Sequence, residues 1–367
     1  YQNLFNMALT GNKGEWSELY VLFKLLSDKR IYAGDGNLNK LEAFYPVLSV
    51  LRDELTRNLE YSINNDIVIV AEDGYEVSRI NVTDFIGQSE ILFSSIQNAP
   101  KGKGAFEIPS INDFLGKIHC QKIKAKSSDK ADIHVVIHDY HTGMKPKLGF
   151  SIKSDAGSSP TLLNASKPTT FVYEVVCNSF NDEQMNTINA IGGRRKLQDR
   201  VNAIAEMGGV LKFANIPNSI FESNLRMIDS YLPEIIGWMI ADSYLARDMN
   251  IRRAVERIRN SNPLNYNLTD GHDFYGYKLK ALMVCTALGM LPATQWNGRY
   301  EATGGYIVVK EDGDVICFHL YDRNLLEDYL FYNTKFETPK SERYEMGNIY
   351  KIGDKYFFNL ILQIRFI

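Results

Sequence analysis

Two short segments that read as neighbouring β-strands, residues 130–137 and 148–153, constrain the fold of this chain most. Residues 139–143 between them carry aspartate, threonine and glycine, which favour a turn. In an antiparallel hairpin, directly opposed residues lie on one face of the sheet. The pattern therefore predicts a sheet with one apolar face and one face on which a carboxylate lies beside an ammonium group. The predicted register has three pairs: Asp132 with Lys153, His134 with Ser151, and Val136 with Gly149.

The length and composition of the chain are those of a globular protein with a large core. Of its 367 residues, 45% are hydrophobic and 23% are charged, so we expect one elaborated domain or two domains. No apolar run approaches the roughly 20 residues of a membrane span, so a membrane is not an expected partner. The N-terminal stretch lacks the order of a signal peptide, which favours a cytoplasmic protein. The four cysteines form no CxxC pair, which argues against a structural zinc site.

The order of the expected elements predicts an α/β (α+β) fold with a mixed central sheet flanked by helices. Apolar periodicity predicts helices over residues 10–30 and 40–60, and through most of residues 182–290. Strands are expected at residues 67–70 and 169–176, and β patterns dominate again after the long helical stretch.

An aspartate and a lysine on adjacent strands suit the hydrolysis of a phosphodiester bond. The reaction requires a divalent ion that polarises the phosphate, a water that loses a proton, and cationic groups that neutralise the growing negative charge. Mg²⁺ is held by one or two carboxylates, while phosphate oxygens and waters fill its other positions. We expect Asp132 to be the main metal ligand, and Lys153 to orient the attacking water and stabilise the charged transition state.

Ser151 stands where metal-dependent nucleases of the PD-(D/E)xK type carry an acid, two positions before the lysine. Ser151 belongs to the predicted catalytic set, but a hydroxyl replaces a carboxylate poorly, so a second acidic ligand has to come from elsewhere. Glu18 leads, because it interrupts an apolar helical stripe, where a carboxylate is costly unless it is paired or bound to metal. Glu174, on a later strand, is the competing metal ligand, and Asp155 is a weaker third choice.

The same residues also have structural interpretations. Asp132 and Lys153 fit an ordinary cross-strand ion pair, and Glu18 fits a solvated position on a helix. A histidine metal site is disfavoured, because His134 and His138 would lie about 13 Å apart along a strand, too far to share one ion.

Segments spread along the chain together resemble the HpaII type II restriction endonucleases of the PD-(D/E)xK superfamily. In the N-terminal half, the similar segments are residues 11–18, 150–154 and 159–166. In the C-terminal part they are residues 300–306, 333–339 with Ser341 and Arg343, and 362–366. Each motif is weak alone, whereas their order and spread make the resemblance specific.

The resemblance implies a Mg²⁺-dependent endonuclease that cuts double-stranded DNA at a short palindrome, which for this family is 5′-CCGG. It further implies a bacterial, cytoplasmic enzyme that works beside a DNA methyltransferase without stable binding between the two. A palindromic site fits a two-fold symmetric homodimer, and a monomer that cuts the strands in turn remains an alternative. Because the net charge is −3, any basic surface that contacts DNA has to be local.

Polar and basic side chains in loops are the predicted DNA contacts. In the major groove, arginine or lysine reads guanine, while acidic groups or backbone carbonyls read cytosine. Ordinary loops or a solvated helix face would account for the same residues. The candidates are Thr161 and Asn164 after the lysine, Arg194 and Arg195 after a glycine pair, Gln295, Asn297 and Arg299 around Trp296, and Lys335, Ser341 and Arg343 near the end.

We expect three parts in chain order. Residues 1–180 are the predicted catalytic nuclease core, residues 181–290 a helical subdomain, and residues 291–367 a β-rich part that completes DNA recognition. Two other functions fit the same residues. One is a structure-specific or repair DNA nuclease with the same metal core, and the other is a DNA-binding protein that Ser151 leaves without catalytic activity.

Overall fold

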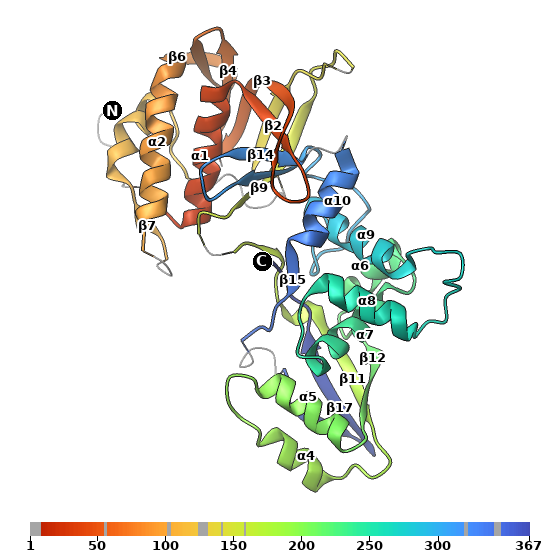
Figure 1. Ribbon diagram of the computed structural model, residues 1–367. Coiled ribbons are helices and arrows are strands. Elements are labelled where there is room, and N and C mark those ends of the chain that lie inside the picture. Colours follow the sequence, from red (N-terminus) through yellow and green to blue (C-terminus); the bar gives the residue numbers. More distant parts are fainter. Residues whose placement is uncertain are drawn as a thin grey trace. The chain divides into compact units, whose positions relative to one another are not determined.

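The computed structural model describes residues 9–54, 57–100, 104–123, 131–140, 142–157, 159–318, 322–340 and 346–367. These residues form a mixed α/β structure that divides into two compact units (Figure 1). Unit 1 comprises Tyr1–Pro160 and Tyr300–Tyr329, and unit 2 comprises Thr161–Arg299 and Leu330–Ile367. None of the helices in the described ranges combines the length and the apolar character that are needed to cross a lipid bilayer.

Unit 1 is built on a mixed sheet that has nine strands in the described part of the chain. β13 runs parallel to β9, and β14 runs parallel to β2, while the other neighbours are antiparallel. In order across the sheet, the strands are β2 (Arg30–Gly34), β14 (Val315–Phe318), β13 (Gly305–Val309), β9 (Lys147–Ser154), β8 (Ile133–Ile137), β3 (Lys40–Glu54), β4 (Arg57–Asn64), β5 (Ile67–Glu72) and β6 (Tyr75–Asn81). Strands β8 and β9 therefore lie in the middle of the sheet.

Helix α1 (Lys13–Asp28) covers one face of this sheet and packs beside α2 (Val82–Asn98) (Figure 1). It begins with a capping box, in which the Asn12 side chain accepts from the Glu15 N–H at 3.1 Å and Glu15 Oε2 accepts from the Asn12 N–H at 2.9 Å. Its apolar side chains enter a core shared with Phe150 and Ile152 of β9. Burial of this stripe fixes the helix against the strand that carries the site. The shorter elements of unit 1 are β1 (Thr10–Gly11), β7 (Phe106–Glu107), η1 (Pro109–Ile111) and α3 (Asn112–Lys117).

In its described residues, unit 2 has two antiparallel sheets and a set of helices packed beside them. One sheet has the order β12 (Val210–Asn215), β11 (Thr170–Val176), β17 (Lys355–Ile361), β16 (Ile349–Ile352), and the other β10 (Thr161–Leu163), β18 (Ile364–Phe366), β15 (Thr334–Phe336). α7 packs on the first sheet, where the buried Tyr173 hydroxyl donates to Gly237 O at 2.8 Å. The helices are α4 (Asp182–Asn189), α5 (Lys196–Glu206), α6 (Ser219–Ile228), α7 (Leu232–Leu245), α8 (Ile251–Ser261) and α9 (Phe274–Leu288), with η2 (Lys167–Thr169), while α10 (Arg323–Tyr332) spans the boundary between the units.

The predicted helix over residues 40–60 is wrong, because this segment forms β3 and β4. Burial along β3 alternates through Tyr45 and Val47, then shifts by one residue before Val50. The shift matches the irregularity in the pairing of β3 with β8. Leucine spacing alone suits a helix here, but pairing with strands on both sides decides the structure.

The hairpin of β8 and β9 forms as an antiparallel pair, but the predicted register is wrong by two residues. His134 pairs with Gly149 instead of Ser151, and Val136 pairs with Lys147 instead of Gly149. The turn sets this register, since the Asp139 N–H donates to Met144 O at 3.0 Å. A shift of two residues leaves every side chain on its predicted face.

The two units follow different boundaries from the three predicted segments. Residues 300–329 return to unit 1, where β13 and β14 complete the large sheet, and residues 161–180 belong to unit 2. The functional roles assigned to residues 1–180, 181–290 and 291–367 stay predictions.

Candidate active site

Asp132 lies immediately before β8, and the neighbouring strand β9 fixes its position. The Asp132 N–H donates to Phe150 O at 2.8 Å. Its Oδ2 accepts from the Ile152 N–H at 2.7 Å and from the Ser151 hydroxyl at 3.2 Å. When the observed register is continued by one residue, Asp132 comes opposite Ser151, and Lys153 follows on the same face. One carboxylate oxygen is thus held by donors of β9.

Lys153 lies near the end of β9, on the same face of the sheet as Asp132. Its Nζ is 5.1 Å from the centre of the Tyr306 ring on the adjacent strand β13. Burial lowers the pKa of Lys153, while the negative charges of Asp132 and Glu18 act in the opposite direction. Both carboxylates therefore lie within electrostatic reach of the ammonium group. The structure brings together Asp132, Lys153 and Glu18, and Ser151 contacts the cluster through Asp132.

Glu18 reaches this cluster from α1, which packs against β9. The preceding residue ties the helix to the strand, because the Ser17 hydroxyl donates to the Ser154 hydroxyl at 2.8 Å. Glu18 is half-buried, and its charge acts on Lys153. The sequence places a carboxylate on an apolar stripe of α1, and the packing of α1 against β9 brings that carboxylate within electrostatic reach of Lys153.

The two carboxylates form a donor set that suits a hard divalent cation. Mg²⁺ binds oxygen ligands, and one or two carboxylates suffice when phosphate oxygens and waters complete its coordination. Within the described ranges, no three histidine, cysteine, aspartate or glutamate side chains gather closely enough to hold a metal ion. Asp132 and Glu18 would leave positions on such an ion for phosphate oxygens and waters.

The other two acids predicted as second ligands have different surroundings. Glu174 lies on β11 in unit 2, where its carboxylate accepts from Lys355 Nζ at 3.0 Å. Asp155 follows β9, and its N–H donates to Val309 O at 2.9 Å. Burial raises the pKa of Asp155, and the charge of Glu311 raises it further. Neither Glu174 nor Asp155 is among the described charges that act on Lys153.

Tyr306 is a residue of this cluster that the sequence did not point to as functional. It is 1% exposed, and it pairs with Ser151 in the parallel register of β13 and β9. Burial raises the pKa of its hydroxyl, and the Asp132 charge adds to this effect. In the sequence, Tyr306 opens an apolar strand far from the hairpin, so it reads as a core residue.

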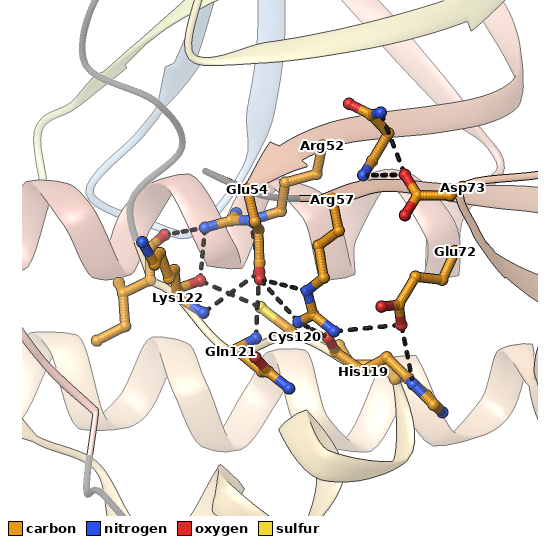
Figure 2. A network of polar contacts seen from close by, with 12 residues as sticks. Arg52, Glu54, Arg57, Glu72, Asp73, His119, Cys120, Gln121 and Lys122 are labelled. Carbon is orange, nitrogen blue, oxygen red and sulfur yellow. Dashed lines mark hydrogen bonds and ion pairs between the residues drawn. The ribbon is translucent and has the colours of Figure 1, made fainter. Parts of the chain in front are cut away.

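A buried ionic network holds the segment that precedes β8 (Figure 2). Glu54 Oε1 accepts from the Gln121 and Lys122 N–H groups at 3.1 and 3.2 Å, and its Oε2 pairs with Arg57 at 2.8 Å. Arg52 donates to Lys122 O at 2.7 Å. Side chains of β3 and β4 thus fix residues 120–122, and β3 itself pairs with β8.

The predicted DNA contacts that the structure describes all belong to unit 2. Lys335 pairs with Glu337 at 3.7 Å, and most of the others are exposed. Ser341 and Arg343 lie outside the described residues. The described candidates are Thr161 on β10, Asn164 after it, Arg194 and Arg195 before α5, Gln295, Asn297 and Arg299 after α9, and Lys335 on β15.

The loop after α9 is anchored by its tryptophan. The main-chain N–H of Trp296 donates to Asn224 Oδ1 at 3.0 Å, and its indole Nε1–H donates to Arg299 O at 3.0 Å. The Arg299 N–H in turn donates to Asn297 Oδ1 at 3.0 Å. These bonds fix the loop backbone, while the side chains of Gln295, Asn297 and Arg299 stay exposed.

Similarity to known proteins extends over both units. The family model described as HpaII restriction endonuclease matches residues 12–366. The type II restriction enzyme HpaII of Haemophilus parainfluenzae is 45% identical over 359 residues, which cover 98% of this chain and 99% of that enzyme. No solved structure matches the chain.

Proposed function

This chain belongs to the HpaII restriction endonuclease family and is a type II restriction endonuclease, and we propose that Asp132, Lys153 and Glu18 form its active site. The substrate is double-stranded DNA, and the reaction is hydrolysis of a phosphodiester bond. The observation that carries the proposal is that β9, which carries Lys153, also holds Asp132 Oδ2 through the Ile152 N–H at 2.7 Å and the Ser151 hydroxyl at 3.2 Å. Helix α1, which carries Glu18, is joined to the end of the same strand by the hydrogen bond between the Ser17 and Ser154 hydroxyls at 2.8 Å. Two carboxylates can hold a divalent ion at the phosphate, and a lysine beside them can stabilise the negative charge that develops there.

Type II restriction enzymes generally use divalent metal ions, and we propose that Asp132 and Glu18 hold Mg²⁺ here. A bound divalent ion supplies Lewis-acid polarisation of the phosphate and acidifies water. Lys153 orients the attacking water by hydrogen bonding and stabilises negative charge as it develops on the phosphate. Ser151 acts through Asp132, because its hydroxyl donates to Oδ2 and so restricts the carboxylate.

Unit 1 supports the further proposal of a restriction-endonuclease-like core. Its mixed sheet carries the proposed site at the two central strands, with Lys153 on β9 and Asp132 immediately before β8, and α1 supplies an acid from the layer that covers the sheet. Loops of unit 2 would then contact DNA. We assign Arg194 and Arg195 to phosphates, and Gln295 and Arg299 to base edges, because all four side chains are exposed.

The finer biological proposals come from the family. We propose the recognition sequence 5′-CCGG, a companion DNA methyltransferase that protects host DNA, and action in the bacterial cytoplasm. A palindrome is read most simply by a two-fold symmetric homodimer, which we propose as the active form.

Cleavage of defined DNA tests the function. Linear DNA with a single CCGG sequence, and a matched DNA with one base pair of that sequence changed, are incubated with protein and Mg²⁺. We expect two fragments from the first DNA and none from the second. Degradation without discrete fragments, or cleavage of branched DNA alone, would favour a repair nuclease. Specific binding without cleavage in Mg²⁺ or Mn²⁺ would favour a non-catalytic DNA-binding protein.

A further inference from the structure

The ring of Tyr306 forms a surface under the amino group of Lys153. Nζ lies 5.1 Å from the ring centre, within the range of a cation–π interaction. The two residues belong to adjacent parallel strands, in which Tyr306 pairs with Ser151 and Val308 pairs with Lys153. Tyr306 and Lys153 are therefore diagonal neighbours on one face of the sheet.

The Tyr306 ring is itself held in place. It meets the Tyr329 ring edge to face, with centroids 6.5 Å apart, and Tyr329 stacks on Phe318 at 4.2 Å. The start of β13 is also fixed, because the Gly304 N–H donates to Gly149 O at 2.7 Å. A Cβ at Gly304 would come within 2.5 Å of the Phe150 ring, so this close approach requires glycine. The ring thus offers a rigid surface to a lysine whose long side chain is flexible.

We propose that Tyr306 is a positioning residue for the cleavage reaction, which holds the Lys153 ammonium group beside Asp132 over the face of its ring. This inference rests on the proposed active site. The aromatic face performs the role, since the ring quadrupole attracts the cation. A phenyl ring should therefore replace the tyrosine, and an aliphatic side chain of similar bulk should not.

Single-turnover cleavage of CCGG DNA by Tyr306→Leu, Tyr306→Phe and wild-type full-length enzyme tests the proposal. We expect Tyr306→Leu to cleave about 5- to 30-fold more slowly, and Tyr306→Phe to stay within about threefold of wild type. Affinity for the same DNA, measured in Ca²⁺, should be unchanged in both variants. Val309→Ala, a truncation of a buried side chain on the opposite face of β13, controls for a general loss of packing. It should lower the melting temperature while leaving the cleavage rate near that of wild type.

The outcomes separate this inference from the proposed function. Wild-type enzyme that does not cleave CCGG DNA would overturn the function itself. With cleavage by wild type established, equal rates for Tyr306→Leu and wild type would overturn the role of the ring. Equal slowing in Tyr306→Leu and Tyr306→Phe would assign the effect to the hydroxyl and also overturn it. Slowing of Val309→Ala to the rate of Tyr306→Leu would make the effect one of packing.

Discussion

The main-chain N–H of Ile152 donates to Oδ2 of Asp132 at 2.7 Å. Strand β9 therefore carries the proposed catalytic lysine and also holds the proposed metal ligand through its own backbone. The Ser151 hydroxyl adds a second, longer bond to the same oxygen. The serine that replaces the usual acid thus contacts the carboxylate of the proposed site, and the proposed second acid comes from α1.

Ser151→Ala removes the weaker of the two described donors to Asp132 Oδ2. We expect the single-turnover cleavage rate to fall by about tenfold, because the Ile152 N–H still holds the carboxylate. Asp132→Asn should cost at least about 100-fold, since it removes a charge from the proposed metal site. A loss for Ser151→Ala as large as that for Asp132→Asn would show that the serine has a direct part in catalysis.

Glu18→Gln removes the charge of the acid supplied by α1 while keeping its shape. The Mg²⁺ concentration that gives half-maximal cleavage should rise by about tenfold or more. Glu174→Gln is the matched control, because that carboxylate bonds Lys355 in unit 2. If Glu174→Gln raises the Mg²⁺ requirement and Glu18→Gln does not, the second ligand is Glu174.

Glu54→Gln removes the closer of the two carboxylates that pair with Arg57 in the network of Figure 2, and Glu72 remains at 3.2 Å. The Glu54 and Arg57 side chains are almost fully buried, at 3% and 10% exposure, but Glu72 still neutralises Arg57, so the free energy of unfolding should fall by about 1–3 kcal/mol. Urea unfolding measures the change. Glu76→Gln removes an ion pair to Arg79 on the surface and should have no measurable effect. Equal stability of the two variants would contradict a stabilising role for the network.

The free energy of unfolding should depend on pH through Asp248. The hydrogen bond from Arg253 lowers the pKa of Asp248 to about 2, partly opposed by burial and helped by the Asn250 N–H. The folded state binds this proton less readily than the unfolded state, so Asp248 stabilises the fold above its ordinary pKa. That contribution is lost as the pH falls through about 4 toward about 2. Asp248→Asn should therefore be less stable than wild type near neutral pH, with a gap that closes in acid. A gap that persists unchanged in acid would contradict this linkage.

Local patterns in the sequence were sufficient to predict the central hairpin and the position of Glu18 on a helix. Alternating apolar residues mark β8 and β9, and one acid on an apolar helical stripe marks Glu18. The register escaped prediction because it depends on the Asp139–Met144 bond in the turn, which residue types alone do not specify. Since the register was wrong by two residues, each side chain of the hairpin still lies on the face of the sheet that was predicted for it.

The remaining differences between the predicted and the observed structure come from pairing of strands that are far apart in the sequence. β3 has leucine spacing that suits a helix, yet its pairing with β4 and β8 makes it a strand. Tyr306 joins the cluster through the parallel pairing of β13 with β9, which nothing near either strand encodes. The boundary between the units has the same origin, because β13 and β14 return to the first sheet from far along the chain.

The role proposed for Lys153 is to stabilise charge at a metal-dependent cleavage site. Lys153→Ala tests it most directly, with Lys147→Ala as the matched control, since Lys147 is an exposed lysine on the same strand. Cleavage of CCGG DNA in Mg²⁺ and binding of the same DNA in Ca²⁺ are measured for both variants. We predict that Lys153→Ala loses cleavage by at least about 100- to 1,000-fold and keeps specific binding, while Lys147→Ala retains both. Near-normal cleavage by Lys153→Ala would contradict the account.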